Sequence, residues 1–342
     1  MSYVRFMIGL VSSLIALLVI LPVLLLSLPF WIVTIIQNGI YTLVRSIRPI
    51  PSSWDALIQY HPVIGWKPKP NMKTYAKGTR EHIYELTTDE DGWRKGKNGI
   101  ADNDVYVFGD SFAFGFGAND DEFFANLLLR PRIKAIGANG YNMVQELILM
   151  EKYAPLFKNK TVVWFIYHGN DLYENMTPNM RQYRMPFIRE INGTAECEIV
   201  TSHVNPSYWS INTKLDYYGK LAEICSDTPL SKRAFAACDY LIQRGKEICD
   251  RVNARLCIIS LPDIIQIDTT RVVELAEKTY KNNSFDPDLP DKKLKRICQN
   301  HSVAFYTLKE YLTPDHFINK DVHWNREGNR RVAQLIKDIY EK

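Results

Sequence analysis

The pattern of hydrophobic and polar positions divides the chain near residue 45. No charged residue lies between Arg5 and Arg45, and Leu, Ile, Val and Phe dominate this stretch. A helix needs about 20 such residues to cross a bilayer. A cleaved signal peptide has a much shorter apolar core, followed by a small-residue cleavage site. The pattern therefore predicts a retained membrane anchor over residues 1–44.

Two prolines leave the form of this anchor open. Pro22 and Pro29 interrupt the apolar run. One possibility is a span over 7–28 followed by an interfacial helix over 30–44. The other is a re-entrant hairpin bent at the prolines, which would put both of its ends on one side. The flanking basic residues are balanced, so the positive-inside rule does not set the orientation.

Beyond residue 103, short apolar runs alternate with segments of helical periodicity. Strands are predicted over 105–108, 134–136, 161–167, 256–262 and 303–308. Helices are predicted over 121–130, 142–153, 231–252, 269–280, 290–300 and 326–340. Strands that alternate with helices indicate an α/β domain whose parallel sheet is covered on both faces.

Three further assignments complete the predicted organisation. Residues 45–103 are interpreted as a connector with a small β sub-structure, including a strand over 81–86, and residues 104–342 as the main domain. Residues 176–230 are aromatic and show no regular pattern, so we expect an irregular insertion or cap. Its aromatic residues could stack on sugars or form the cap's own core; they are Tyr183, Phe187, Tyr208, Trp209, Tyr217 and Tyr218.

Composition narrows the classes of function. The 342 residues include 42 basic and 38 acidic side chains, a net charge of +4, so we expect no nucleic-acid partner. With 46% hydrophobic residues, the chain can bury the core of one large domain or two small ones. The six cysteines show no CxxC or metal-like spacing. The sequence is compatible both with disulfides and with buried free thiols. Sequons such as those at Asn192 and Asn282 matter only in a secreted eukaryotic protein.

A serine follows the first strand of the main domain. Gly109-Asp110-Ser111 comes directly after the strand predicted over 105–108. A serine at a tight strand-to-helix turn lies at the carboxyl edge of the sheet, where open α/β folds bind ligands. The N–H groups of the following helix could hold an oxyanion there. The alternative is an ordinary turn in which Asp or Ser caps the helix.

Three more candidate positions come after later predicted elements. Gly140 follows the second strand and could bring its N–H close to a ligand oxygen, or could be a loop glycine. Asn170 follows the third strand, where its amide could donate to an oxyanion or cap a turn. His323 precedes the last helix, beside Asp321. A histidine oriented by a carboxylate is the base that makes a serine nucleophilic, but it could also be an ordinary surface histidine.

Together, the four blocks resemble those of the SGNH hydrolases, also called the GDSL esterase/lipase family, over roughly residues 104–340. The resemblance implies a flavodoxin-like three-layer fold. It also implies that Ser111 is the nucleophile and His323 the base. The oxyanion hole would consist of the N–H groups of Ser111 and Gly140 and the side-chain amide of Asn170.

Two blocks depart from the family pattern. The third block usually reads Gly-x-Asn-Asp, whereas His168 takes the place of its first glycine here. The last block usually reads Asp-x-x-His, but Lys320 is the residue three before His323. Asp321, two before it, is the predicted orienting acid, and Asp315 is the reserve candidate. An Asp-x-His-Trp-Asn block resembles membrane-associated relatives that handle acyl groups on polysaccharides.

The resemblance implies acyl transfer through a seryl ester, without a metal or an organic cofactor. The first hypothesis is therefore a membrane-anchored esterase or O-acyltransferase that acts on an acyl-ester substrate, a cell-envelope glycan, outside the cytoplasm. The second hypothesis is a lipid esterase or thioesterase placed at the bilayer. The third is a non-catalytic assembly factor that keeps the fold, and the intact set of four residues argues against it.

Overall fold

The computed structural model describes residues 54–78, 82–97, 99–180, 183–191, 194–200, 217–268, 270–277 and 285–342. The anchor predicted over 1–44 and the sequons at Asn192 and Asn282 lie outside these residues. Within the described ranges, no helix is both long enough and apolar enough to cross a membrane.

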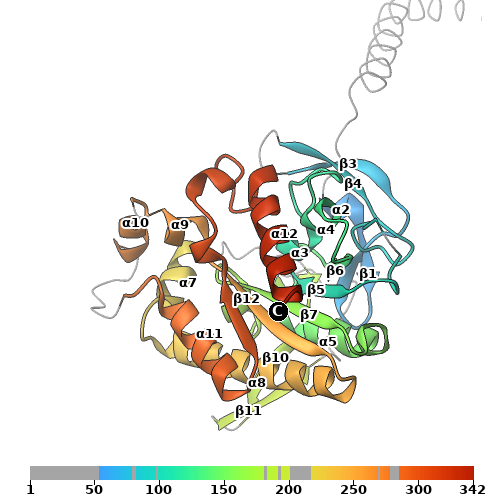
Figure 1. The fold of residues 1–342 in the computed structure, drawn as a ribbon. Helices are drawn as coiled ribbons and strands as arrows, with labels where there is room; N and C mark the ends of the chain where they lie inside the picture. Colours follow the sequence, from blue (N-terminus) through green and yellow to red (C-terminus); the bar gives the residue numbers. More distant parts are fainter. Residues whose placement is uncertain are drawn as a thin grey trace, which may run out of the picture. The chain divides into compact units, whose positions relative to one another are not determined.

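A five-stranded parallel sheet forms the centre of the protein (Figure 1). Its strands are β5 (Val105–Gly109), β6 (Ile133–Gly137), β7 (Thr161–Tyr167), β12 (Arg255–Leu261) and β13 (Ala304–Thr307). They lie in the order β13-β12-β7-β5-β6, which is the flavodoxin-like order 2-1-3-4-5 read from the opposite edge. Every residue of β5, β6 and β7 is buried, as expected for strands covered on both faces. The five predicted strands are confirmed.

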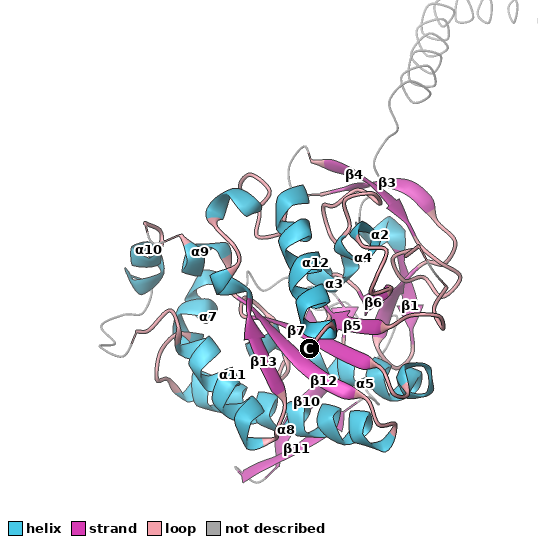
Figure 2. Ribbon diagram, in the orientation of Figure 1, coloured by secondary structure: helices cyan, strands magenta, loops and turns pink. Residues whose placement is uncertain are grey.

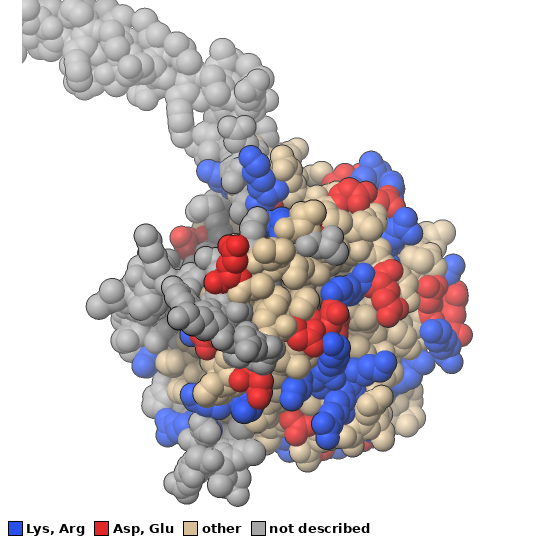
Figure 3. All heavy atoms as spheres, turned by 90° about the vertical axis from the view of Figure 1, so that its left-hand side faces the viewer, with Lys and Arg blue, Asp and Glu red and all other residues tan. Residues whose placement is uncertain are grey.

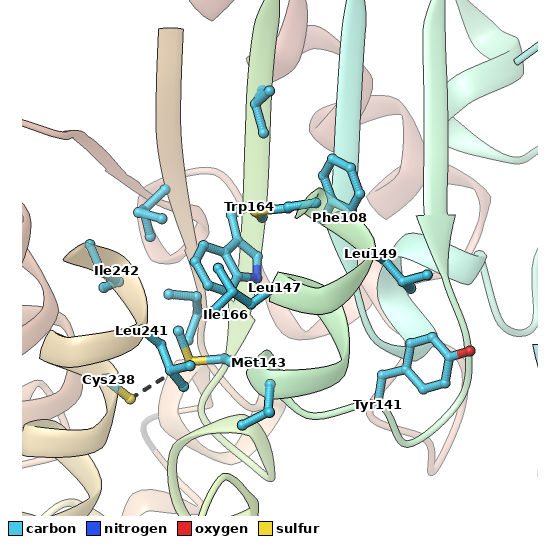
Figure 4. Close-up of a cluster of buried hydrophobic side chains, with 14 of the residues drawn as sticks. Phe108, Tyr141, Met143, Leu147, Leu149, Trp164, Ile166, Cys238, Leu241 and Ile242 are labelled. Atoms are coloured by element: carbon cyan, nitrogen blue, oxygen red, sulfur yellow. Dashed lines mark hydrogen bonds between the residues drawn. The ribbon is translucent and has the colours of Figure 1, made fainter. Parts of the chain in front are cut away.

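Helices cover both faces of this sheet (Figure 2). One face carries α5 (Met143–Tyr153), α8 (Pro229–Arg251) and α11 (Leu289–Asn300), and the other carries α3 (Ser111–Phe114), α4 (Phe124–Leu127) and α12 (Arg326–Tyr340). Side chains alternate along β7, since Trp164 joins the first cluster while Val163 and Phe165 join the second. Figure 4 shows Trp164 together with Leu147 of α5 and Leu241 of α8.

The helix predicted over 121–130 is wrong except for one turn. Only α4 is helical there, and Leu128 already has extended dihedral angles. Pro131 disfavours helical angles at the residue before it, so the periodic pattern cannot continue as a helix. The other predicted helices are present, with ends shifted by a few residues; they are α5, α8, α10 (Val272–Glu277 as described), α11 and α12.

The insertion predicted to be irregular over 176–230 contains regular structure. Its described residues form β8 (Asn179–Met180), β9 (Tyr183–Arg184), the hairpin of β10 (Phe187–Ile191) with β11 (Thr194–Val200), and α7 (Tyr217–Ile224). The dipeptide Asn192-Gly193 between β10 and β11 is typical of a two-residue hairpin loop, a signal that the sequence reading overlooked. Tyr208 and Trp209 lie outside the described residues.

Residues from 54 onward belong to one compact unit, which includes the described part of the predicted connector. This segment contains α2 (Trp54–Leu57), the hairpin of β1 (Ile58–His61) with β2 (Gly65–Pro68), and the hairpin of β3 (Lys73–Lys77) with β4 (Ile83–Thr87). The strand predicted over 81–86 is therefore present as β4. Trp66 donates from Nε1 to the carbonyl of Asn139 (3.2 Å), and its own carbonyl accepts from Tyr141 Oη (2.8 Å). These two bonds hold the loop that carries Gly140.

The buried side chain of Arg94 holds the loop that follows α3. Its guanidinium pairs with Asp120 (2.9 Å) and donates at 2.6–3.0 Å to the carbonyl groups of Glu85, Gly115 and Ala118. No part of this side chain is exposed. A buried cation is tolerated only when its donors are paired, so the four bonds explain how the segment accommodates an arginine.

We expect Arg94→Met to lower the free energy of unfolding by about 3–5 kcal/mol, because it removes the cation that faces a partly buried carboxylate and a donor from each of three carbonyl groups. Lys73→Met is the control. It removes an exposed ion pair with Glu85 (3.8 Å) and should cost less than about 1 kcal/mol. Urea unfolding of both variants measures the difference, and equal costs would show that Arg94 does not stabilise the loop.

Charges on the described surface are mixed in sign. On the face drawn in Figure 3, acidic side chains lie next to basic ones. Ion pairs on the described surface include Lys292 with Asp286 (2.6 Å) and Lys232 with Asp227 (3.2 Å). That no nucleic acid binds stays a prediction.

Five of the six cysteines are free and buried; they are Cys225, Cys238, Cys249, Cys257 and Cys298. Burial raises the pKa of each of these thiols, for Cys249 to about 12. A protonated, buried thiol is chemically inert, so these cysteines act as small apolar side chains. The side chain of Cys197 lies outside the described part of the chain.

Candidate active site

The site lies where the order of strands reverses at the carboxyl edge of the sheet. The chain runs from β5 outward to β6 and then returns past β5 to β7. In doubly wound sheets, ligands bind at this switch point. Three of the four predicted site residues follow these strands: Ser111 begins α3 after β5, Gly140 follows β6, and Asn170 follows β7.

Asp110, not Ser111, caps the short helix α3. The Asp110 carboxylate accepts the N–H of Phe112 (3.0 Å). Capping by Asp110 is one of the two possibilities that the alternative interpretation of this turn allowed, and it leaves the hydroxyl of Ser111 out of the cap. Glycine is required at position 137, the last residue of β6. A Cβ there would lie 2.1 Å from the carbonyl oxygen of Gly109, the last residue of β5. Both strand ends can therefore lie close together beneath the serine.

His323 joins Ser111 and Asp321 through opposite ring nitrogens. Its Nε2 lies 2.7 Å from Ser111 Oγ, and its Nδ1 lies 2.7 Å from Asp321 Oδ1. A carboxylate can only accept, so Nδ1 carries the proton and Nε2 accepts the proton of the Ser111 hydroxyl. Ser111 is 8% exposed. The geometry is that of a serine with its general base and an orienting acid.

The spacing Asp-x-His has a local explanation. The N–H of Asp321 donates to the carbonyl of Ile318 (2.9 Å), which closes a turn with Lys320 at φ +61°. Asp321 Oδ1 also accepts the backbone N–H of His323 (3.2 Å). Burial raises the pKa of Asp321, but the hydrogen bonds that its carboxylate accepts from His323 outweigh burial, and the net shift of the pKa is downward. The acid is therefore ionised and held two residues before its histidine.

The reserve candidate Asp315 is not the orienting acid. Its carboxylate accepts from Thr313 Oγ1, and the residue is exposed. The Nδ1 position of His323 is occupied by Asp321. Proximity in sequence made both acids plausible, and only the turn around Lys320 distinguishes them.

Aromatic rings that the sequence reading missed enclose the imidazole of His323. The ring centroids of Phe112 and Phe116 lie 4.9 and 4.4 Å from it. Trp324 packs on Phe112 at 4.6 Å. Asn325 caps α12, because its side chain accepts the N–H groups at positions 327 and 328. The block that carries the base is thus anchored on both sides.

The two remaining predicted residues lie on the loops beside Ser111. Gly140 has φ +74°, a conformation that favours glycine. Asn170 stands at the N-cap position of α6 (Asp171–Glu174), but its side chain makes no capping bond. Its Nδ2 lies 3.5 Å from Glu174 Oε2, and its Oδ1 is buried without a partner in the described part of the chain. The amide is therefore not used to cap the helix.

A second polar cluster at this edge also escaped the sequence reading. The hydroxyls of Tyr167 and Tyr217 both donate to Asp263 Oδ2, at 2.5 and 2.6 Å. Tyr217 covers Gly169, where an added Cβ would lie 1.9 Å from its hydroxyl oxygen. Tyr217, one of the predicted cap aromatics, is thus bonded within the protein. Its partners are far apart in sequence, so no local pattern indicated the cluster.

Three carboxyl groups are buried below the site: Asp110, Glu146 of α5 and Asp171 of α6. Glu146 accepts from Trp164 Nε1 (2.6 Å) and Asp171 from the N–H of Tyr167 (2.7 Å). Burial raises the pKa of all three, that of Asp110 to about 6. Within the described ranges, no group of three or more His, Cys, Asp or Glu side chains is arranged to hold a metal ion.

Asp110→Asn should change how stability depends on pH. Burial raises the pKa of Asp110 from 3.8 to about 6, so the folded state binds this proton more tightly than the unfolded state. The contribution of the protonated Asp110 to the free energy of unfolding is complete below pH 3.8 and is lost as the pH rises through 6. A pKa difference of about 2 corresponds to about 3 kcal/mol. Relative to the wild type, Asp110→Asn should therefore gain free energy of unfolding between pH 4 and 7, and a difference independent of pH would contradict this.

No protein-family model matches the chain, and a search of curated proteins found no significant match. Solved structures do match. A psychrotrophic esterase from Pseudoalteromonas sp., inhibited by monoethylphosphonate, is 10% identical, with 70% of this chain and 100% of that chain covered and a TM-score of 0.38. A lipolytic protein of the G-D-S-L family from Veillonella parvula is 11% identical, covering 70% and 98%, with a TM-score of 0.39. A GDSL-like lipase from Bacteroides thetaiotaomicron is 13% identical, covering 69% and 87%, with a TM-score of 0.38. Two of these three structures are described as members of the GDSL type, and the third is an esterase.

Proposed function

We propose that the protein is a serine ester hydrolase of the SGNH type. The observation that carries this proposal is the hydrogen-bonded line from Asp321 through His323 to Ser111, with 2.7 Å at both junctions. Each group has the neighbour that its chemical role requires, and the serine hydroxyl is not needed for capping. A protein that served only as a scaffold would gain nothing from this alignment.

The first half-reaction forms a seryl ester. Ser111 Oγ attacks the ester carbonyl carbon while its proton passes to His323 Nε2, and Asp321 stabilises the imidazolium. The N–H groups of Ser111 and Gly140 and the amide of Asn170 donate to the oxyanion. As the tetrahedral intermediate collapses, the bond to the alcohol oxygen breaks, and His323 gives its proton to that oxygen.

The second half-reaction releases the acyl group. Water gives a proton to His323 Nε2 and attacks the seryl ester, and the carboxylic acid leaves as the proton returns to Ser111 Oγ. Another alcohol in place of water would make the same site an O-acyltransferase. These steps need no group besides the side chains and backbone of the chain itself.

For the substrate and location, we propose an acyl ester of a cell-envelope glycan, reached by a domain outside the cytoplasm and anchored through residues 1–44. The sequence Asp321-Val322-His323-Trp324 and the charge-free stretch before Arg45 support this. A reporter fused after residue 342 tests the side of the membrane. Activity of that reporter in the cytoplasm alone would contradict the proposed location.

The substrate class is tested with the full chain in detergent. We expect hydrolysis of 4-nitrophenyl acetate, slower hydrolysis of 4-nitrophenyl octanoate, and release of acetate from an O-acetylated polysaccharide. Preference for the octanoate would favour a lipid substrate instead. Absence of hydrolysis with every ester in a folded sample would contradict an esterase.

A further inference from the structure

His168 occupies a buried position just before the proposed oxyanion donor. It follows β7, is 1% exposed, and precedes Gly169 and Asn170. The sequence pattern described above has glycine at this place, so an imidazole here needs its own explanation. A buried histidine must have partners for its ring nitrogens.

The side-chain amide of Gln266 determines that Nδ1 of His168 carries a proton. His168 Nδ1 lies 3.1 Å from Gln266 Oε1. That oxygen already accepts the N–H of Asp263 (2.8 Å), and Gln266 Nε2 donates to the carbonyl of Pro287 (2.8 Å). These two bonds orient the amide with its oxygen toward the imidazole, so His168 Nδ1 is the donor.

The other ring nitrogen joins Ser260 and Asp291. Nε2 lies 2.7 Å from Ser260 Oγ and 3.5 Å from Asp291 Oδ1. Asp291 also accepts from Thr307 Oγ1 (2.8 Å). Burial raises the pKa of Asp291, but its interactions with His168, Ser260 and Thr307 outweigh burial and lower the pKa to about 2. One imidazole thus connects the end of β7 to β12, α9 (Ile264–Ile267) and α11, and through the ionised Asp291 to β13.

This cluster is not a second catalytic triad. Ser260 is fully buried, so no substrate can reach its hydroxyl. Ser260 and Asp291 also lie at the same ring nitrogen, whereas Ser111 and Asp321 lie at opposite nitrogens of His323. The cluster can hold a segment in place but cannot relay a proton from a nucleophile.

The structure assigns to His168, together with Ser260 and Asp291, a positioning role for the amide of Asn170. That amide makes no capping bond, its Oδ1 has no partner among the described residues, and its Nδ2 has one long contact, 3.5 Å to Glu174 Oε2, so the backbone before it contributes strongly to its direction. Fixing the backbone at position 168 fixes where the donor points. This inference rests on the proposed function, because it needs an oxyanion for Asn170 to bind.

The test measures the second-order rate at which a fluorophosphonate probe labels Ser111 in the full chain in detergent. Ser260→Ala removes one oxygen from the cluster and should slow labelling about tenfold, less than the 10²- to 10³-fold typical of a deleted oxyanion donor. His168→Gln should slow it similarly. Asn170→Ala should slow it about 100-fold. Ser226→Ala is the matched control, since the hydroxyl of this buried serine donates to the Ala222 carbonyl (2.9 Å), and this variant should label at the wild-type rate.

A double-mutant cycle separates positioning from a general loss of structure. If Ser260 acts through Asn170, then Ser260→Ala should slow labelling less than about twofold in the Asn170→Ala background. Wild-type rates in both Ser260→Ala and His168→Gln would overturn the inference, as would a full tenfold loss in the Asn170→Ala background. Failure of the folded wild type to label would instead overturn the proposed function, and the inference with it. Melting temperatures of all variants establish that each is folded.

Discussion

Replacement of Ser111 by alanine should lower kcat for 4-nitrophenyl acetate by on the order of 10⁶-fold. The reason is that Ser111 Oγ forms the covalent bond to the acyl group, and no other hydroxyl of the described residues hydrogen-bonds to His323 Nε2. His323→Ala should have a similar effect, since an unactivated hydroxyl is a weak nucleophile at neutral pH. The double variant should be no worse than either single variant, because residues that act as one unit do not contribute additively.

Ser231→Ala is the control for this prediction. Ser231 is also buried, and its hydroxyl donates to the Ile224 carbonyl (3.3 Å), away from the candidate site. Its kcat should equal that of the wild type. If Ser111→Ala kept more than a small fraction of the activity, the hydrolysis would arise elsewhere, and the assembly-factor hypothesis would gain support.

Asp321→Asn should lower kcat by on the order of 10⁴-fold with the fold intact. Asp321 Oδ1 accepts from His323 Nδ1 at 2.7 Å, which keeps Nε2 free to accept the serine proton. An asparagine can present its N–H₂ group instead, which stabilises the wrong tautomer and leaves the imidazolium without a counter-charge. Steady-state kinetics at neutral pH measures the loss, which should fall on kcat far more than on KM.

Asp315→Asn is the matched substitution for this prediction. Asp315 lies on the same loop, but its carboxylate is bonded to Thr313. We expect unchanged kinetics for this variant. The reverse result, a large loss in Asp315→Asn and a small one in Asp321→Asn, would mean that the loop adopts another arrangement during the reaction.

Local pattern was sufficient to predict the sheet. Strand β7 contains Thr161 to Tyr167, a continuous run of β-branched and aromatic residues that fits a strand buried on both faces. The prediction of a helix over 121–130 failed for a local reason too. The apolar residues have helical spacing, but the helix ends after one turn at the extended Leu128, and Pro131 disfavours helical angles at the residue before it.

The candidate site was also predictable only where a local sequence pattern indicated it. Ser111 and His323 stand in short blocks whose residue types indicate their chemistry. The bond between them spans 212 positions, and the residues that support it lie equally far apart. Arg94, which holds the loop after α3, and the Tyr217 and Asp263 pair were invisible because each makes its contacts across the fold rather than along the chain.

The central claim is that Ser111 is an activated nucleophile. Its most direct test is reaction of the full chain with a fluorophosphonate probe, followed by mapping of the adduct by mass spectrometry. We predict one adduct, on Ser111, formed by the wild type and absent from His323→Ala. A folded wild-type protein that forms no adduct, or forms it at another serine, would contradict the claim.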